Sequence, residues 1–302
     1  HKPAPRPGRT PVALMTAPQR LVYLGTPQAA VPPLEALCAA GFDIVQVITG
    51  PDKRRGRRAE LSPSPVKEAA QALGLPVAHE LDALNDCSAD LGVVVAYGKL
   101  LPMNLLQRIP MVNLHFSLLP KWRGAAPVER SLLAGDANTG VCVMEVAQEL
   151  DTGGIYAKTE VAIGQQTARQ LRQKLVKVGS ELLTQTLLAG LGAPVPQDGT
   201  PSYAHKITTE DRHLNWNHPA EELLRQVRLG GAWTTFRGQR FKIWVAETGQ
   251  NTASDPGTLH HDHVATGQGT LRLIEVQAEN KARQPWDTWQ TGARLTDQDR
   301  LI

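Results

Sequence analysis

The chain has 302 residues, of which 41% are hydrophobic and 20% are charged, and its formal net charge is +3. This composition predicts a folded globular protein of about two domains, and it excludes a disordered or strongly basic chain. Apolar runs of the roughly 18 residues that cross a bilayer do not occur in the sequence, so we expect no membrane association. Cys38, Cys87 and Cys142 are widely spaced, which predicts free thiols in a reducing cytoplasm and no zinc site.

The first part of the chain reads as a proline-rich extension followed by an α/β domain. Residues 1–19 contain five prolines and no acidic residue, so we expect a disordered extension and not an amphipathic targeting helix. From residue 20 to 192, continuous apolar strands alternate with helices, which predicts a Rossmann-like, mostly parallel sheet covered on both faces. The expected strands are 21–24, 43–49, 91–97, 111–115 and 141–146, and the expected helices are 33–40, 66–73 and 169–191.

A second, smaller domain is expected after a short linker. Residues 193–206 are rich in proline and glycine and poor in apolar residues, so they are interpreted as the linker. A helix is expected at 220–229, and alternating apolar residues at 240–247 and 270–276 predict half-buried strands. Short strands separated by glycine-rich turns over residues 207–302 indicate a small, OB-like β-barrel.

The candidate catalytic residues are Asn113, His115 and Asp151. Asn113 and His115 are two residues apart at the end of a predicted strand, so both point to one face, at the edge where open α/β sheets bind ligands. An amide can donate a hydrogen bond to a developing oxyanion, and an imidazole can move protons near neutral pH. A carboxylate can orient that imidazole. Because an obvious serine or cysteine nucleophile is absent, direct transfer fits better than an acyl-enzyme, although spacing alone leaves a structural role equally open.

The motifs around these residues resemble those of the folate-dependent formyltransferases. Asn-x-His-x-Ser-Leu-Leu-Pro at 113–120, Trp-Arg-Gly-Ala-Ala-Pro at 122–127 and Leu-Asp-Thr-Gly at 150–153 carry the resemblance. Shorter matches occur at 24–27, 62–67, 94–98 and 131–136. Within the family, the chain is most similar to the members that act on methionyl-tRNA.

The resemblance implies transfer of the formyl group of 10-formyltetrahydrofolate to the α-amine of methionine on initiator tRNA, without a metal. It implies that Asn113 holds the formyl oxygen, that His115 moves protons between the attacking amine and the departing folate nitrogen, and that Asp151 orients His115. It further implies a folate-binding loop and a pterin pocket, formed by Ser117, Leu118, Leu119 and Pro120 and by the backbone near Val95 and Tyr97.

A basic run at 53–58 is the candidate tRNA contact. It places five positive charges in six residues, including Lys53, Arg55, Arg57 and Arg58. A solvated charged loop is the alternative, but its position after the second strand puts it on the same sheet edge as the candidate site, which favours contact with RNA phosphates. The resemblance implies that Arg57 is a key residue, that the barrel binds the tRNA body, and that the protein is a monomer.

Two other functions remain open from the sequence. The first is a folate-dependent formyltransferase or hydrolase that acts on a small molecule such as a sugar nucleotide, which would share the same catalytic residues. The second is a non-catalytic RNA-binding module. His260, His261 and His263 around Asp262 imitate a metal site, but an incidental cluster is expected there, and the absence of G-x-G-x-x-G disfavours a dinucleotide cofactor.

Overall fold

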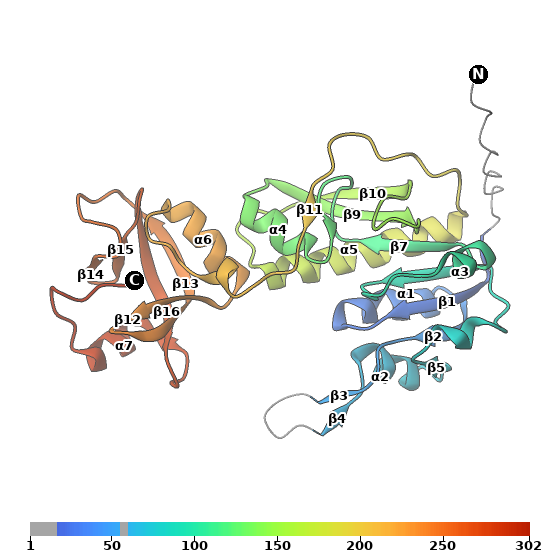
Figure 1. Cartoon of the computed structure of the whole chain (residues 1–302), viewed down its shortest axis with the longest axis horizontal. Coiled ribbons are helices and arrows are strands. Elements are labelled where there is room, and N and C mark those ends of the chain that lie inside the picture. Colours follow the sequence, from blue (N-terminus) through green and yellow to red (C-terminus); the bar gives the residue numbers. More distant parts are fainter. Residues whose placement is uncertain (1–16, 55–59) are drawn as a thin grey trace, which may run out of the picture. The chain divides into compact units, whose positions relative to one another are not determined.

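The computed structural model describes residues 17–54 and 60–302, which form two compact units (Figure 1). The first unit comprises the described residues up to Ala125, together with Thr139–Val161 and Gln173–Tyr203; the second comprises Ala126–Asn138, Ala162–Arg172 and Ala204–Ile302. Residues 1–16 of the predicted extension lie outside the described residues. At the start of the first strand, the backbone N–H groups of Gln19 and Arg20 both donate to Asp90 Oδ2, at 2.8 and 2.9 Å.

The first unit contains a seven-stranded sheet in the order β10-β9-β7-β6-β1-β2-β5. Strand β1 pairs in parallel with β2 and β6, β6 with β7, and β2 with β5, whereas β7 and β9 are antiparallel. The predicted, mostly parallel α/β sheet is therefore confirmed. The strands are β1 (Arg20–Gly25), β2 (Asp43–Ile48), β5 (Val77–Ala78), β6 (Leu91–Val95), β7 (Met111–His115), β9 (Asn138–Glu145) and β10 (Ile155–Ala162).

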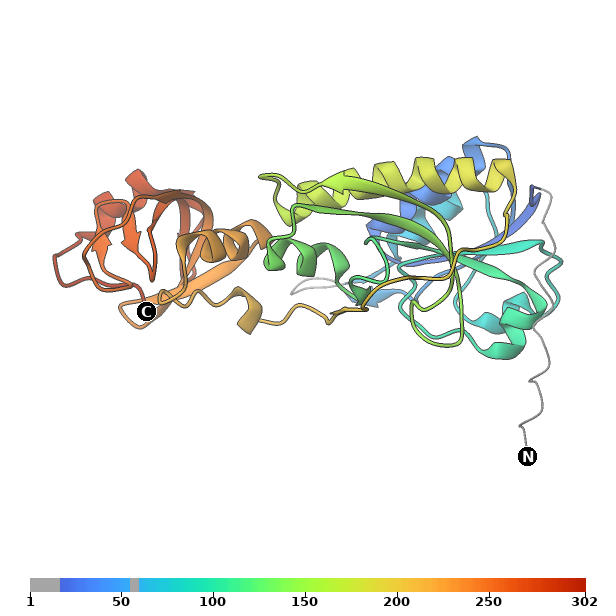
Figure 2. The ribbon, with the colours of Figure 1, turned by 90° about the horizontal axis from the view of Figure 1, so that it is seen from above.

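Helices cover this sheet because their apolar residues recur at helical spacing. Helix α2 begins where Ser64 Oγ accepts from the Lys67 N–H at 3.0 Å, with Pro65 in the first turn. Figure 2 shows α5 lying along one face of the sheet, and a Cβ on Gly179 of α5 would lie 3.1 Å from a methyl of Leu114 in β7. The helices of this unit are α1 (Val31–Ala39), α2 (Pro65–Ala72), α3 (Met103–Arg108) and, from Gln173 onward, α5 (Ala168–Ala189), whereas α4 (Pro127–Ala134) belongs to the second unit.

The second unit is built on an antiparallel sheet in the order β12-β13-β16-β15-β14, and β17 pairs with β16. The sheet closes through the end of the chain, because Leu301 bridges Phe236 in β12 while Arg300 bridges Thr258 beside β14. The predicted small barrel is thus confirmed. Its elements are α6 (Ala220–Leu229), β12 (Ala232–Phe236), β13 (Gln239–Gly249), β14 (Leu259–His260), β15 (His263–Ala265), β16 (Thr270–Ala278), β17 (Gln284–Pro285) and α7 (Trp286–Ala293).

Aromatic side chains fill the core of this barrel. Phe241, Trp286 and Trp289 are buried together, with the Phe241 and Trp289 ring centroids 4.6 Å apart and those of Trp286 and Trp289 4.8 Å apart. Three large aromatic groups remove far more apolar area from water than short aliphatic residues would. Their packing explains how a unit of short strands retains a single core.

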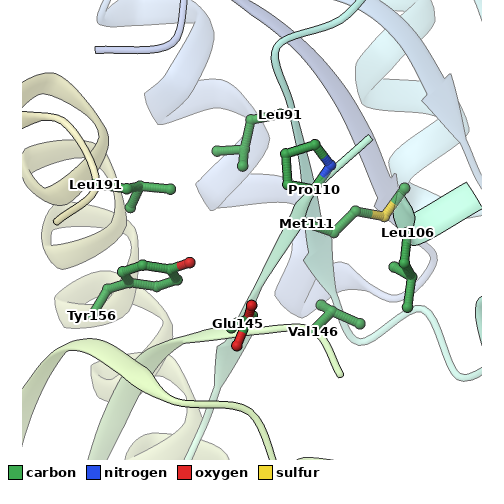
Figure 3. Close-up of a pocket in the computed structure, with 8 residues that line it drawn as sticks. All are labelled: Leu91, Leu106, Pro110, Met111, Glu145, Val146, Tyr156 and Leu191. Atoms are coloured by element: carbon green, nitrogen blue, oxygen red, sulfur yellow. The ribbon is translucent and has the colours of Figure 1, made fainter. Parts of the chain in front are cut away.

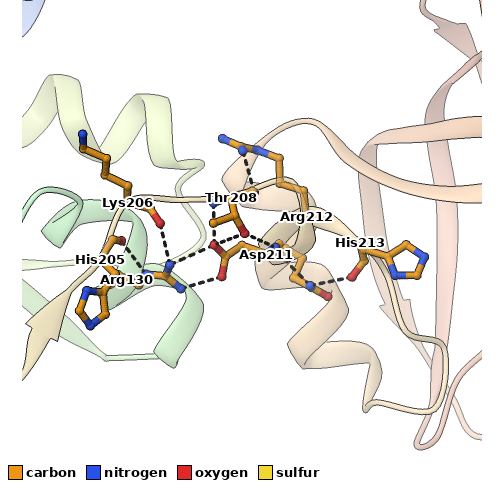
Figure 4. Close-up of polar contacts among 8 residues, drawn as sticks. Arg130, His205, Lys206, Thr208, Asp211, Arg212 and His213 are labelled. Carbon is orange, nitrogen blue, oxygen red and sulfur yellow. Dashed lines mark hydrogen bonds and ion pairs between the residues drawn. The ribbon is translucent and has the colours of Figure 1, made fainter.

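An ion-paired network in the second unit fixes the chain that leads into the barrel (Figure 4). Arg130 on α4 binds both carboxylate oxygens of Asp211, at 2.7 and 3.0 Å, and also donates to the carbonyls of His205 and Lys206. The Arg130 guanidinium is the main cause of the lowered pKa of the Asp211 carboxyl. This bidentate pair, together with a 2.7 Å bond from the Thr208 N–H to Asp211, holds residues 205–211 in one conformation.

Candidate active site

Strand β7 places Asn113 and His115 at the carboxyl edge of the sheet. Asn113 pairs with Val94 of β6 on one side and with Met144 of β9 on the other, and His115 is the last residue of the strand. Leu114, between them, packs against α5. Because side chains alternate along a strand, Asn113 and His115 both lie on the face opposite α5. Asn113 is half-buried and His115 is buried.

The imidazole of His115 is held by one ring nitrogen, which leaves the other facing a carboxylate. His115 Nε2 lies 2.9 Å from the carbonyl oxygen of Trp122, and since a carbonyl only accepts, Nε2 carries the hydrogen and donates. Nδ1 then lies 3.7 Å from Asp151 Oδ2, with both side chains less than a tenth exposed. This separation is longer than a hydrogen bond. Nδ1 is therefore the atom that can take up a proton, and the Asp151 charge stabilises the imidazolium that results.

Asp151 is fixed by its own turn and by a backbone donor from a distant loop. Its φ of +53° lies in the left-handed region, and the Gly124 N–H donates to its Oδ2 at 2.8 Å. At Gly153, a Cβ would lie 1.9 Å from the Glu145 carbonyl oxygen, which excludes every residue but glycine at that point. The glycine of the Asp-Thr-Gly sequence is thus required by the backbone, and the Asp151 carboxylate faces His115.

The loop after β7 is closed by Ser117. This residue is fully buried, and its hydroxyl donates to the Lys121 carbonyl at 2.6 Å. Leu119 packs on Cys142 and Met144 of β9, and burial raises the pKa of the Cys142 thiol to about 11. Leu118 and Pro120 are half-buried. Ser117 and Leu119 therefore shape the loop from within, and a folate contact at these two positions would come from the backbone.

Comparisons with known proteins identify the family. Residues 19–187 match the model for "Formyl transferase", and residues 206–294 match that for "Formyl transferase, C-terminal domain". The chain is 43% identical over 307 residues to the methionyl-tRNA formyltransferase of Thiobacillus denitrificans, covering 93% of this chain and 99% of that protein. It is 41% identical over 306 residues to the one of Paenarthrobacter aurescens, covering 94% and 99%.

The chain belongs to the formyl transferase family.

Solved structures with the same fold have lower sequence identity. An N-formyltransferase from Helicobacter canadensis, in complex with folinic acid and dTDP-3-aminofucose, superposes with a TM-score of 0.66 at 18% identity, covering 84% of this chain and 99% of that one. HypX from Aquifex aeolicus, in complex with tetrahydrofolic acid, gives 0.61 at 14%, covering 91% of this chain and 47% of that one. At these identities the likeness establishes the formyl transferase fold alone.

Membership of the formyl transferase family supports a folate co-substrate, and the structure has a polar atom suited to one. Strand β6 ends at Val95, Ala96 has a φ of +47°, and Tyr97 follows. The strand predicted for 91–97 is therefore two residues shorter, because the backbone turns away at Ala96. The Tyr97 hydroxyl is buried without a hydrogen-bond partner among the residues that the structure describes. Such a group favours a bound molecule that supplies the missing bond.

Only part of the predicted tRNA-binding run can be placed. Lys53 is exposed in β3 (Lys53–Arg54), which pairs antiparallel with β4 (Leu61–Ser62). Arg55, Arg57 and Arg58 lie outside the described residues. The hairpin is anchored at its base, because Lys67 Nζ binds both carboxylate oxygens of Asp52 at 2.8 and 2.9 Å. The described end of the run is thus a surface hairpin, which suits an electrostatic contact.

A small pocket of about 110 Å³ lies at the other edge of the sheet (Figure 3). Leu91 and Met111 in its lining are the first residues of β6 and β7, whereas Asn113 and His115 are at the end of β7. Glu145 and Tyr156 add polar groups, and burial with the nearby Glu145 charge raises the pKa of Tyr156 to about 12. The pocket is therefore separate from the candidate active site.

Residues of the histidine cluster at 260–263, which imitates a metal site in the sequence, are bonded to other side chains. His263 binds Asp262 at 2.7 Å, and His260 binds the Ser254 hydroxyl at 2.6 Å. In the described part of the chain, groups of three or more His, Cys, Asp or Glu residues that could hold a metal ion are absent.

Within the same residues, no helix is long and apolar enough to cross a bilayer. The three cysteines are free.

Two residues beside the candidate active site, Arg123 and Gln197, were not among the candidate residues predicted from the sequence. Arg123 lies in the Trp-Arg-Gly-Ala-Ala-Pro motif, and its guanidinium donates to Gln197 Oε1 from Nε and Nη2, at 3.1 and 2.6 Å. Gln197 belongs to the residues interpreted as a linker. The sequence signal over residues 193–206 was their richness in proline and glycine and their lack of apolar residues, which says nothing about what such a segment contacts.

Proposed function

We propose that this protein transfers the formyl group of 10-formyltetrahydrofolate to the α-amine of methionine on initiator tRNA, giving formylmethionyl-tRNA for translation initiation. The observation that carries the chemistry is the buried His115, with Nε2 on a carbonyl and Nδ1 facing Asp151. The choice of substrate is supported by 43% and 41% sequence identity, over both domains, to two proteins named methionyl-tRNA formyltransferase.

The three residues divide the work of the transfer. The Asn113 amide donates to the formyl oxygen as negative charge develops there, which stabilises the transition state more than the ground state. His115 Nδ1 takes a proton from the attacking amine and supplies one to the departing nitrogen, each step contributing about 10²- to 10⁴-fold. The Asp151 carboxylate stabilises the charged imidazole between these two events. Because the formyl donor arrives activated, the scheme uses no metal.

The remaining assignments are also proposals. Ser117, Leu118, Leu119 and Pro120 form the folate loop, and the backbone at Val95 with Tyr97 forms the pterin pocket. Lys53, Arg55, Arg57 and Arg58 contact tRNA phosphates, and the barrel at 207–302 binds the tRNA body, after a catalytic domain at 20–192 and a linker at 193–206. We further propose a monomer in the cytoplasm. Size-exclusion chromatography with light scattering tests the first of these two properties, and fractionation tests the second.

The deciding experiment is transfer of labelled formyl from 10-formyltetrahydrofolate to charged initiator Met-tRNA. Elongator Met-tRNA and free methionine serve as controls. Transfer to the initiator alone supports the proposal. Transfer to a small amine such as an amino sugar nucleotide, or formate release without transfer, would replace it by a small-molecule formyltransferase or a hydrolase. Binding of tRNA without folate turnover would leave a non-catalytic RNA-binding module.

A further inference from the structure

A segment after α5 runs across the active-site loop and is bonded to it at several points. We call residues 195–204 the strap. Val195 exchanges two backbone hydrogen bonds with Ile155, at 2.8 and 2.9 Å. At its other end, Ser202 donates to the Pro120 carbonyl, accepts from the Arg123 N–H at its own carbonyl, and accepts from the Trp122 N–H at Oγ, at 3.2, 2.8 and 2.9 Å. The strap therefore holds the loop that binds His115.

Gln197, between these two ends, uses both halves of its amide. Its Nε2 donates to the carbonyls of Asp151 and Gly153, each at 2.8 Å. Its Oε1 accepts the two guanidinium bonds from Arg123. A single half-buried side chain thus joins the Asp-Thr-Gly turn to the loop at 122–124. An amide is the only uncharged group that can donate and accept in this way at that length.

These two segments are the ones that orient the catalytic pair. Trp122 supplies the carbonyl that holds His115, and Gly124 supplies the N–H that holds Asp151. Arg123 lies between them in the sequence and is bonded to Gln197. A shift of the Asp151 turn relative to the loop would therefore change the separation of His115 Nδ1 and Asp151 Oδ2, which is 3.7 Å in the structure.

We propose that Gln197 is a positioning residue for the His115–Asp151 pair, acting by bridging the Asp151 turn to Arg123. The residue touches neither substrate nor reacting atom in this scheme. The inference rests on the proposed function, because it assumes that the pair moves the protons of formyl transfer. Under this proposal the strap is part of the active site, and not only a connection between α5 and the barrel.

The test compares two substitutions with a matched control. Gln197→Leu removes both arms of the bridge. Gln197→Glu keeps an acceptor for Arg123 but places an oxygen against the carbonyls of Asp151 and Gly153. The control is Gln46→Leu in β2, since Gln46 Nε2 also donates to two backbone carbonyls, those of Val47 and Pro76, each at 3.2 Å.

The proposal predicts a fall in kcat without a comparable change in substrate affinity. Displacement of catalytic groups by about 1 Å costs about 10²-fold, so both Gln197 variants lose about 10- to 100-fold in kcat, while KM for tRNA and tetrahydrofolate affinity by calorimetry change less than about 3-fold. The pH profile of kcat, which reports the proton-transfer groups, also shifts. Gln46→Leu lowers Tm by a similar amount but leaves kcat and its pH profile unchanged.

Three results would overturn the positioning role. The first is a normal kcat in Gln197→Leu, and the second is a loss of activity that only follows Tm in both Gln197→Leu and Gln46→Leu. The third is full recovery of kcat in Gln197→Glu, which would show that the arm to the Asp151 turn is unnecessary. Failure of the proposed function has a different signature, namely wild-type folate turnover without transfer to tRNA. Formate release then replaces transfer as the readout, and the same variant ratios decide the role of Gln197.

Discussion

The loops around His115 and the exposed face of the barrel hold their polar groups in contrasting ways. At His115, the orienting groups come from Trp122, Gly124 and the Asp151 turn, and the residue is only 5% exposed. On the barrel, Arg240 lies over Trp233 with Cζ 4.0 Å from the ring centroid, within the single hairpin β12–β13. The first arrangement depends on hydrogen bonds between side chains and the backbone of separate loops, whereas the second is built by neighbouring strands.

The two regions therefore meet different requirements, namely precise atom positions at His115 and exposed positive charge on the barrel. Proton transfer requires atoms held within fractions of an ångström, which buried hydrogen bonds from several segments provide. An exposed cation over an aromatic ring attracts a polyanion over a broader range of positions. Substitutions in the first region should therefore change kcat, and those among exposed cations should change affinity and its dependence on salt.

The largest expected effect is at the catalytic residues. Asn113→Ala and His115→Ala should each lower the single-turnover rate of formyl transfer by about 10²- to 10⁴-fold, because they remove the oxyanion donor and the proton-transfer group. His218→Ala is a matched control, since His218 pairs with Glu222 on the barrel. Near-normal rates of formyl transfer in either catalytic variant would contradict the proposed mechanism.

Asp151→Asn tests the carboxylate charge with little change of shape. Asparagine keeps an oxygen for the Gly124 N–H but loses the charge that stabilises the His115 imidazolium. We expect a fall of about 10²-fold in kcat, with tetrahydrofolate binding retained when measured by calorimetry. An unchanged rate would show that Asp151 acts only as a structural acceptor for the loop.

Neutralising the basic run should have a smaller effect, and on affinity. With Arg55, Arg57 and Arg58 changed to Gln, tRNA binding should weaken and the slope of log affinity against log salt should flatten by about two units. Folate affinity should stay constant. Arg240→Gln with Lys242→Gln on the barrel provides a comparison at a described cationic face. If the slope is unchanged in the triple variant, the run is an ordinary solvated loop.

The smallest effect concerns the acid stability of the barrel. Arg237 binds Asp299 at 2.6 Å and lowers the pKa of that carboxyl to about 2, from an ordinary value of 3.8. A lowered folded-state pKa stabilises the protein above pH 4, and this stabilisation is lost as the pH falls toward 2. Arg237→Leu should therefore have a lower Tm at pH 7, and its Tm should converge with that of the wild type near pH 2. A constant difference across this range would exclude the ion pair as its cause.

Much of the fold was predictable because burial repeats with the period of each element. Strand β7 and helix α6 begin and end at the predicted residues, and the alternating residues of β13 and β16 form the barrel as expected. Helix α4 was not predicted, because eight residues beginning with proline give few periodic positions. The β6 end at Val95 was also missed, because the left-handed backbone at Ala96 follows from the fold and not from an alanine.

The sequence by itself determined the alternation of helices and strands, the two-part organisation and the residue types for proton transfer. These properties depend on side chains, whose polarity and spacing can be read directly. Only the tertiary structure decided which nitrogen of His115 is free and that Gln197 bridges Asp151 and Arg123. The decisive partners there are backbone carbonyls of Trp122, Asp151 and Gly153, and every residue has a carbonyl. Such bonds leave no pattern in the sequence, because only the folded chain brings their partners together.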